Sequence, residues 1–418
     1  MRSGIATSLG IGAAAALVLL CVVRSDAAMT DAQKFAQIEK GRYLATLADC
    51  AACHTLPNGG KPYAGGRPIE TPFGNVVSAN ITPDHETGIG AWSDQQFDDA
   101  VRRGLRPNGQ RLYPAMPYPA YTKMSRDDVL AIRAYLQSLE PVRNVVDRNT
   151  LPFPLDIRSS MLGWDWLFFT PGEYKPDPRK PPEWNRGRYI VEGPGHCTSC
   201  HTSKNVLGGD KSSGYLRGYR IQGWFAPELT NDRRTGLGAW SLEDIVAFLK
   251  TGHNKTSTAT GPMAEEISHS SSHWNDDDLK AVALYLKSLP GDEENPKPVG
   301  AYDPAMVAGQ AIYQDQCSAC HMIDGKGVPQ LFPSLADAPS VRSKDPASVI
   351  RVILRGARSV PTAAEPTAPG MPSFAWQLTD EQVAAVATYV RNAWQPSAAA
   401  VTAAQVRDTR SNLQSRND

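Results

Sequence analysis

The chain has 418 residues, of which 41% are hydrophobic and 8% aromatic, so it can form about three globular domains of ordinary size. Its 43 basic and 43 acidic residues cancel at pH 7. Without residues 1–27, which hold Arg2, Arg24 and Asp26, the net charge becomes −1. This balance gives no argument for binding to nucleic acid or to anionic lipid.

Residues 1–27 have the pattern of an export signal. Arg2 precedes an apolar run over residues 11–23, and Ser25-Asp26-Ala27 follows as a small-x-small cleavage site. The alternative of a retained membrane anchor is disfavoured because the run is short. Lipoprotein cleavage at Cys21 is disfavoured because a leucine precedes it. We therefore predict a signal peptide over residues 1–27 and an exported mature chain.

The pentapeptide Cys-x-x-Cys-His occurs three times after the signal peptide, starting at Cys50, Cys197 and Cys317. Two thiols so spaced at a helix start can both form thioethers to one porphyrin, and the histidine that follows can bind its iron. The pattern therefore predicts three covalently bound haem c groups. The predicted attachment residues are Cys50, Cys53, Cys197, Cys200, Cys317 and Cys320, and the predicted proximal iron ligands are His54, His201 and His321.

The cysteine count agrees with this interpretation. Of seven cysteines, Cys21 lies in the signal peptide, and the other six are two for each of three haems. No thiol remains for a disulfide. A structural zinc site is the alternative, but it needs two Cys-x-x-Cys pairs close together. The motifs here are 147 and 120 residues apart.

The first two motifs belong to an internal repeat. The stretch 81–93 matches the stretch 229–241 at an offset of 148 residues, against 147 between the first two motifs. Both copies contain Thr-Gly, Gly-Ala-Trp and a serine, Ser93 or Ser241, that is predicted to cap a following helix. The shared offset indicates two domains with one fold.

Each motif is flanked by two predicted helices. The first carries a glycine just before the motif, at Gly41, Gly187 or Gly309, and the closing helices lie around 129–139, 279–289 and 382–394. A glycine lets two helices cross closely, so the ends of each domain can clasp the haem. This is the plan of a small all-α cytochrome c domain.

We therefore predict an all-α fold of three tandem cytochrome c domains, each clasping one covalent haem. A proline-rich linker with the aromatic cluster 164–169 and a shorter polar linker separate them. An Ala-rich, polar tail is expected to be flexible or bound to a partner. The boundaries are 28–145 for domain 1, 146–182 for the first linker, 183–290 for domain 2, 291–303 for the second linker, 304–396 for domain 3 and 397–418 for the tail.

Each domain offers one methionine in a proline-flanked loop as the distal iron ligand: Met116, Met263 and Met371. They follow the proximal histidines by 62, 62 and 50 residues. Distal methionine raises the haem potential relative to histidine. The alternatives are Met124 in domain 1, core filling by any methionine, and a bis-histidine haem in domain 2 that uses His253, His269 or His273.

Other side chains are predicted to support the haems. The Pro333 carbonyl is a candidate acceptor for the second ring nitrogen of His321, and an ordinary turn proline is the alternative. Trp92 and Trp240 are predicted to pack on haem edges or, alternatively, within ordinary cores. His85 and His196 are interpreted as surface or helix-start residues.

With these motifs the chain resembles the triheme cytochrome c subunit of bacterial membrane-associated dehydrogenases, which oxidise alcohols, aldehydes, gluconate, sorbitol or fructose. The similar stretches are Asn80-Ile81-Thr82-Pro83-Asp84, Gly88-Ile89-Gly90, Tyr113-Pro114-Ala115-Met116-Pro117-Tyr118, Gly193-Pro194-Gly195-His196-Cys197 and Met371-Pro372-Ser373-Phe374. The resemblance covers nearly the whole mature chain. It implies that Met116, Met263 and Met371 are the distal ligands.

The resemblance also implies a role and a place. The chain is expected to work in the periplasm, peripherally associated with the outer face of the cytoplasmic membrane. There it would take electrons from a catalytic dehydrogenase subunit (a quinoprotein, flavoprotein or molybdenum enzyme), with a small third subunit as a further component, and pass them to ubiquinone. The C-terminal region is shorter here than in the alcohol dehydrogenase subunits. The cluster 164–169 is a substitute for membrane attachment or, alternatively, packs between the first two domains.

No catalytic residue is predicted, because the chain has no phosphate loop, dinucleotide fingerprint or nucleophile elbow. One alternative function is a multihaem enzyme, such as a peroxidase or a thiosulfate-oxidising cytochrome, which needs an open sixth iron position. Another is a free-standing donor to a terminal oxidase.

Overall fold

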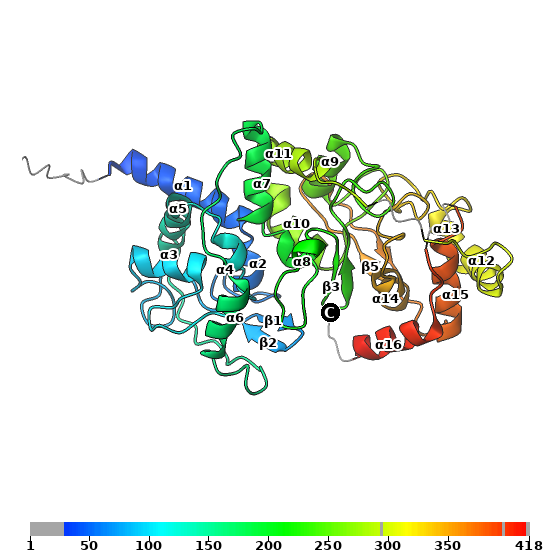
Figure 1. Ribbon diagram of the computed structural model, residues 1–418, viewed down its shortest axis with the longest axis horizontal. Coiled ribbons are helices and arrows are strands. Elements are labelled where there is room, and N and C mark those ends of the chain that lie inside the picture. Colours follow the sequence, from blue (N-terminus) through cyan, green and yellow to red (C-terminus); the bar gives the residue numbers. More distant parts are fainter. Residues whose placement is uncertain (1–28, 293–295, 395–397, 415–418) are drawn as a thin grey trace, which may run out of the picture.

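A computed structural model describes residues 29–292, 296–394 and 398–414 of the chain, so the predicted signal peptide lies outside the described residues. Helices dominate, and the first part of the chain, in blue, lies at the opposite end of the molecule from α12 and α15 (Figure 1). None of the helices in these ranges combines the length and hydropathy of a membrane span. Residues 29–145, 183–290 and 304–394 are called the first, second and third unit below.

Each unit is built on a crossed pair of helices, one before its motif and one at its end. The pairs are α1 (Asp31–Leu47) with α5 (Arg126–Gln137), α7 (Pro182–Glu192) with α11 (Asp276–Lys287), and α12 (Pro304–Gln316) with α15 (Asp380–Val390). The closing helices start at the N-caps Ser125, Asn275 and Thr379, whose side chains accept hydrogen bonds from the first turn.

The glycines of the first helices are required by the crossing. A Cβ atom on Gly41, Gly187 or Gly309 would lie 1.8, 2.0 or 2.2 Å from the carbonyl oxygen of an alanine in the partner helix. No side chain fits at such a distance, so the two helix backbones touch. The predicted close crossing is confirmed in all three units.

The three motifs form single helical turns, α2 (Cys50–His54), α8 (Thr198–His201) and α13 (Ser318–His321). Ser93 and Ser241 cap the helices that they were predicted to cap, α3 and α9. The remaining helices are α3 (Asp94–Arg103), α4 (Tyr118–Tyr121), α6 (Ser160–Phe168), α9 (Leu242–Thr251), α10 (Pro262–His269), α14 (Ala347–Arg355) and α16 (Ala403–Gln414), with the 3-10 turns η1 (Ser212–Gly214) and η2 (Ser271–His273).

Each unit also contains a two-stranded antiparallel hairpin. The hairpins are β1 (Pro68–Thr71) with β2 (Gly74–Val77), β3 (Tyr219–Ile221) with β4 (Trp224–Ala226), and β5 (Ala357–Arg358) with β6 (Gly370–Met371). Their registers pair Pro68 with Val77, Tyr219 with Ala226, and Ala357 with Met371. The all-α prediction is correct for the dominant helices and omits these strands, which are too short to show an alternating pattern.

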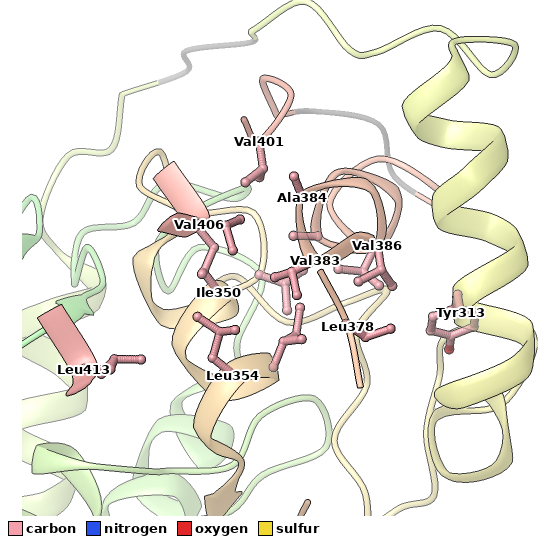
Figure 2. Close-up of a cluster of buried hydrophobic side chains, with 14 of the residues drawn as sticks. Tyr313, Ile350, Leu354, Leu378, Val383, Ala384, Val386, Val401, Val406 and Leu413 are labelled. Carbon is pink, nitrogen blue, oxygen red and sulfur yellow. The ribbon is translucent and has the colours of Figure 1, made fainter. Parts of the chain in front are cut away.

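Hydrophobic clusters lie between the helices of each pair. The first contains Leu44, Phe97 and the fully buried Met124, and the second contains Ile190, Ile245 and Leu279. Figure 2 shows the third, where Ile350, Leu354 and Val383 meet side chains of the chain end. The second cluster also includes Leu47 of α1, so the first two units share a packed boundary.

Residues 398–414 pack onto the third cluster, in contrast to the predicted tail that is mobile or bound to a partner. Val401, Val406 and Leu413 are buried in the third cluster (Figure 2). The guanidinium of Arg410 donates to the Asp380 carboxylate at 2.8 Å and to two backbone carbonyls. The prediction is wrong for residues 398–414. It rested on the mean composition of the segment, which is polar because the few apolar side chains are widely spaced among polar ones.

The first linker packs against both neighbouring units. Trp164 of α6 donates its indole N–H to the Leu207 carbonyl of the second unit at 2.9 Å, and Tyr118 of the first unit donates to Asp165 at 2.6 Å. The predicted packing of the cluster 164–169 between these units is therefore observed. Its other face is open, since Trp166 is 85% exposed and Leu167 55%.

Candidate haem sites

All three motifs open onto one continuous cavity of 3390 Å³. Its walls include every cysteine and histidine predicted from the motifs, and those six cysteines form no disulfide. Burial raises the pKa of Cys50, Cys53 and Cys197 to about 12, so these thiols stay protonated at neutral pH. Thiols paired beside a histidine in an apolar-walled cavity fit covalently attached haem.

A zinc site is not formed. Within the part of the chain that the structure describes, no three His, Cys, Asp or Glu side chains are arranged to hold a metal ion. The zinc interpretation of the motifs is therefore wrong for the described residues.

The three predicted proximal histidines share one geometry. The Nδ1 atoms of His54, His201 and His321 lie 2.7, 2.6 and 3.1 Å from the carbonyl oxygens of Ala79, Pro227 and Pro333. Burial lowers the pKa of all three imidazoles, which favours the neutral ring. A neutral ring that donates from Nδ1 keeps Nε2 as the lone-pair atom for a metal. The predicted Pro333 acceptor is confirmed.

The other two carbonyls were missed from the sequence. A backbone acceptor carries no side-chain signal, and Ala79 and Pro227 have nothing in common as residues. Their numbers nevertheless differ by 148, the offset of the internal repeat. The repeat could therefore have shown that these two carbonyls are equivalent, because the strands β2 and β4 end just before Ala79 and Pro227.

The three candidate distal methionines, Met116, Met263 and Met371, all line the cavity. Met116 packs against the first hydrophobic cluster, and Met371 lies on β6 against the third. Met263 lies in the first turn of α10, beside a small cluster of Ala259, Ile267 and Val360.

The alternative ligands lie elsewhere in the described structure. Met124 is fully buried in the first hydrophobic cluster. His253 is also buried, and its Nδ1 lies 3.2 Å from the Thr258 hydroxyl. Neither of them lines the cavity, and the same holds for His269 and His273.

The remaining predicted side chains also have clear positions. Trp92 and Trp240 line the cavity, and Trp240 packs on Phe248 with ring centres 5.2 Å apart, so both predicted roles are compatible with their positions. His85 is exposed, as predicted. His196 precedes the second motif with a φ of 36° and packs its ring on Tyr121.

The first two sites are linked by Arg67, which sequence analysis did not single out. Its guanidinium donates to the carbonyl of Ala52, within the first motif, at 2.5 Å. It also donates to Glu265 of α10, the helix of Met263, with one bond of 2.9 Å. Arg67 therefore bridges α10, which carries the candidate ligand Met263, to the first motif.

Comparisons with known proteins agree with this chemistry. A cytochrome c family model matches residues 38–140 and 306–394. The chain is 39% identical over 417 residues to the gluconate 2-dehydrogenase cytochrome c subunit of Pantoea cypripedii, with 94% of each chain covered. It is 40% identical over 402 residues to the cytochrome c subunit of alcohol dehydrogenase (quinone) of Gluconobacter oxydans (strain 621H), covering 91% of this chain and 83% of that one. It is 38% identical over 400 residues to the fructose dehydrogenase cytochrome subunit of Gluconobacter japonicus, covering 89% and 82%.

Proposed function

Because the chain belongs to the family of cytochrome c subunits of bacterial dehydrogenases, we propose that it carries electrons within a membrane-associated dehydrogenase complex. A catalytic partner subunit oxidises an alcohol, aldehyde, sugar or polyol. This chain receives the electrons and delivers them to ubiquinone or the respiratory chain. It works in the periplasm, at the outer face of the cytoplasmic membrane.

The observation that carries the proposal is the single cavity onto which all three Cys-x-x-Cys-His motifs open. Electron tunnelling weakens steeply with distance, so carriers that share one cavity can exchange electrons edge to edge. We propose three cytochrome c domains, residues 28–145, 183–290 and 304–396. The repeat and the matching helix pairs support the assignment of the second domain, which lies outside the residues matched by the family model.

In each domain the residues have distinct tasks. The cysteines Cys50, Cys53, Cys197, Cys200, Cys317 and Cys320 attach haem c, while His54, His201 and His321 bind iron on one face and Met116, Met263 and Met371 on the other. Bound haem supplies the one-electron chemistry. The chain orients each imidazole through a carbonyl, and the surroundings of each haem set its potential.

The rival function, a multihaem enzyme, requires an iron with an open or easily displaced sixth position. The presence of a methionine in the cavity wall of each domain supports the carrier instead. The oxidised protein is expected to show three low-spin haems and methionine–iron bands. A high-spin haem would favour the enzyme.

The decisive experiment is purification of the chain, made with intact haem maturation, in mild detergent. Its mass should exceed that of the polypeptide by three haems, with strong Soret absorption. A dehydrogenase subunit that contains a quinone, flavin or molybdenum cofactor should purify with it. Absence of haem would refute the proposal, and isolation as a lone three-haem protein would favour a free-standing donor.

A further inference from the structure

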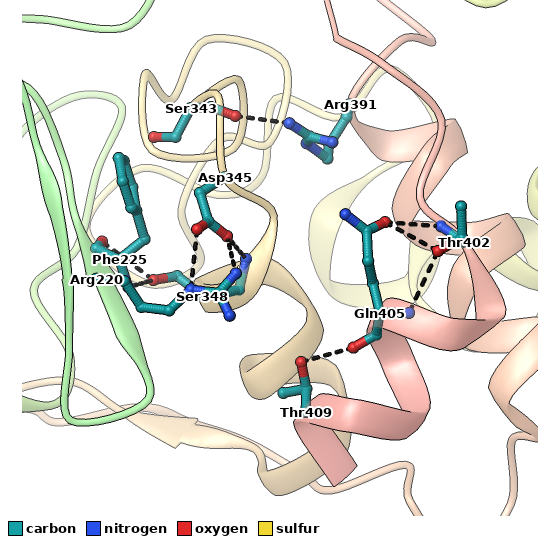
Figure 3. Close-up of polar contacts among 10 residues, drawn as sticks. Arg220, Phe225, Ser343, Asp345, Ser348, Arg391, Thr402, Gln405 and Thr409 are labelled. Carbon is teal, nitrogen blue, oxygen red and sulfur yellow. Dashed lines mark hydrogen bonds and ion pairs between the residues drawn. The ribbon is translucent and has the colours of Figure 1, made fainter. Parts of the chain in front are cut away.

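The second and third units meet through the hairpin β3–β4 and the helix α14. The backbone N–H of Phe225 donates to the Ser348 hydroxyl at 2.9 Å, and that hydroxyl lies 3.2 Å from the Phe225 carbonyl oxygen (Figure 3). Beside this contact, the guanidinium of Arg220 donates to both carboxylate oxygens of Asp345, at 2.9 and 2.6 Å (Figure 3). These bonds fix the hairpin on the helix in one register.

Trp224, next to this contact, is held by two residues. The Arg351 guanidinium of α14 lies 4.6 Å from the centre of the indole ring, and Arg351 is buried. Gly261 also contacts the indole closely, because a Cβ atom at this position would lie 2.4 Å from an indole carbon. A glycine is needed at this position, both for that approach and for its φ of 57°.

The elements that hold Trp224 lead to ligands of both neighbouring sites. Gly261 precedes Met263 by two residues. The strand of Trp224 runs on to Pro227, whose carbonyl accepts from His201. On the other side, α14 runs into β5, which pairs with the strand of Met371. Trp224 and both methionines line the same cavity.

We propose that Trp224, held by Gly261 and Arg351, is the residue that couples the second and third haem sites for electron transfer. This inference rests on the proposed function, because it needs a haem at each site. The electron leaves the reduced iron of one site and arrives at the oxidised iron of the other, and no proton is transferred. The indole keeps its oxidation state, because a cation on its face disfavours an indole radical cation.

The test uses the full-length protein with its haems. Trp224→Leu removes the ring, and Trp224→Phe keeps an aromatic group of smaller size. Haem content, absorption spectrum and potentials are measured first. One haem is then photoreduced, and the electron equilibration among the haems is followed by time-resolved absorbance. Trp224→Leu should slow one equilibration phase by about tenfold, and Trp224→Phe should slow that phase less. The haem potentials should be unchanged in both variants.

Trp166→Leu is the matched control, since Trp166 is 85% exposed and does not line the cavity. This variant should equilibrate as the wild type does. An unchanged rate in Trp224→Leu with three haems would overturn the inference. If that variant loses haem, an unchanged rate in Trp224→Phe overturns it in the same way. A wild-type protein with fewer than three haems would instead refute the proposed function.

Discussion

The hydroxyl of Tyr43 donates a hydrogen bond of 2.6 Å to the carboxylate of Asp278, and this bond joins α1 of the first unit to α11 of the second. The reciprocal bond also exists, because Tyr189 of α7 donates to Asp128 of α5 at 2.5 Å. Tyr43 and Tyr189 each follow the crossing glycine of their helix by two residues. The same repeated surface therefore serves both sides of the boundary.

Each carboxylate at this boundary is also bound by a cation of its own unit. Arg186 donates to both oxygens of Asp278 at 2.7 Å, and the Lys40 ammonium lies 2.7 Å from Asp128. The carboxylates therefore stay paired when either tyrosine is removed. The two tyrosine hydroxyls therefore add a connection between the units that does not depend on the charge pairs.

Removing the hydroxyls should weaken the boundary between the units. Tyr43→Phe and Tyr189→Phe are each expected to lower the free energy of unfolding by about 1.5–3 kcal/mol, the size of a hydrogen bond to a charged group. Urea unfolding of the haem-loaded protein measures this. Tyr302→Phe is the control, since Tyr302 is 96% exposed. Equal stability of all three variants and the wild type would contradict the prediction.

Asp278 should make stability depend on pH in the acid range. Burial by itself raises the pKa of this carboxyl, but the bonds from Arg186 and Tyr43 outweigh burial and hold the pKa below its usual value. In the unfolded chain the pKa of an aspartate is about 4. The stabilisation is therefore complete above that pH and is lost as the pH falls through the pKa of Asp278 in the folded protein. Unfolding followed from neutral to acid pH should show a shallower acid loss in Asp278→Asn. The exposed Asp277→Asn serves as control, and an identical loss in both variants would refute this role.

The helix crossing should tolerate no side chain at Gly187. In Gly187→Ala, the new Cβ would meet the Ala281 carbonyl at 2.0 Å, so the pair α7–α11 must separate. We expect the free energy of unfolding to fall by about 1–3 kcal/mol or more. Gly163→Ala in α6 is the matched control, because nothing lies within 4 Å of its Cβ position, and it should stabilise slightly. Thermal unfolding distinguishes the two.

Replacement of each proposed distal methionine should affect one haem only. Met116→His, Met263→His and Met371→His are expected to lower the potential of one haem each, because histidine favours the oxidised iron relative to methionine. Redox titration with absorption spectroscopy counts the haems that shift. Met124→Leu, in the first hydrophobic cluster, should shift none. If Met124→Leu shifted a haem and Met116→His did not, the ligand of the first site would be misassigned.

The C-terminal helix should contribute to the stability of the third unit. Leu413 is 4% exposed, and Leu413→Ala is expected to cost about 2–5 kcal/mol through lost burial and the cavity left behind. The denaturant concentration at the midpoint of unfolding and the resistance to proteolysis would both fall. Ser411→Ala on the exposed side of α16 should have no effect. If Leu413→Ala left the stability unchanged, the helix would not be part of the core.

Some parts of the structure could not be predicted for a physical reason. The helix α16 was missed because it gains its stability from contacts with α14 and α15, not from its own polar composition. The hairpin β3–β4 was missed because its strands span only three residues each, and its partner α14 lies more than a hundred residues further along the chain.

The sequence by itself determined the chemistry, because thioether attachment and proximal ligation need residues that are neighbours in one helical turn, and spacing is sufficient to recognise them. The repeat and the helix-crossing glycines are equally local. Only the tertiary structure decided which carbonyls meet His54 and His201, that Tyr43 meets Asp278, and that three separate motifs open onto one cavity. Those relationships join residues from 25 to over two hundred positions apart, and packing alone selects them.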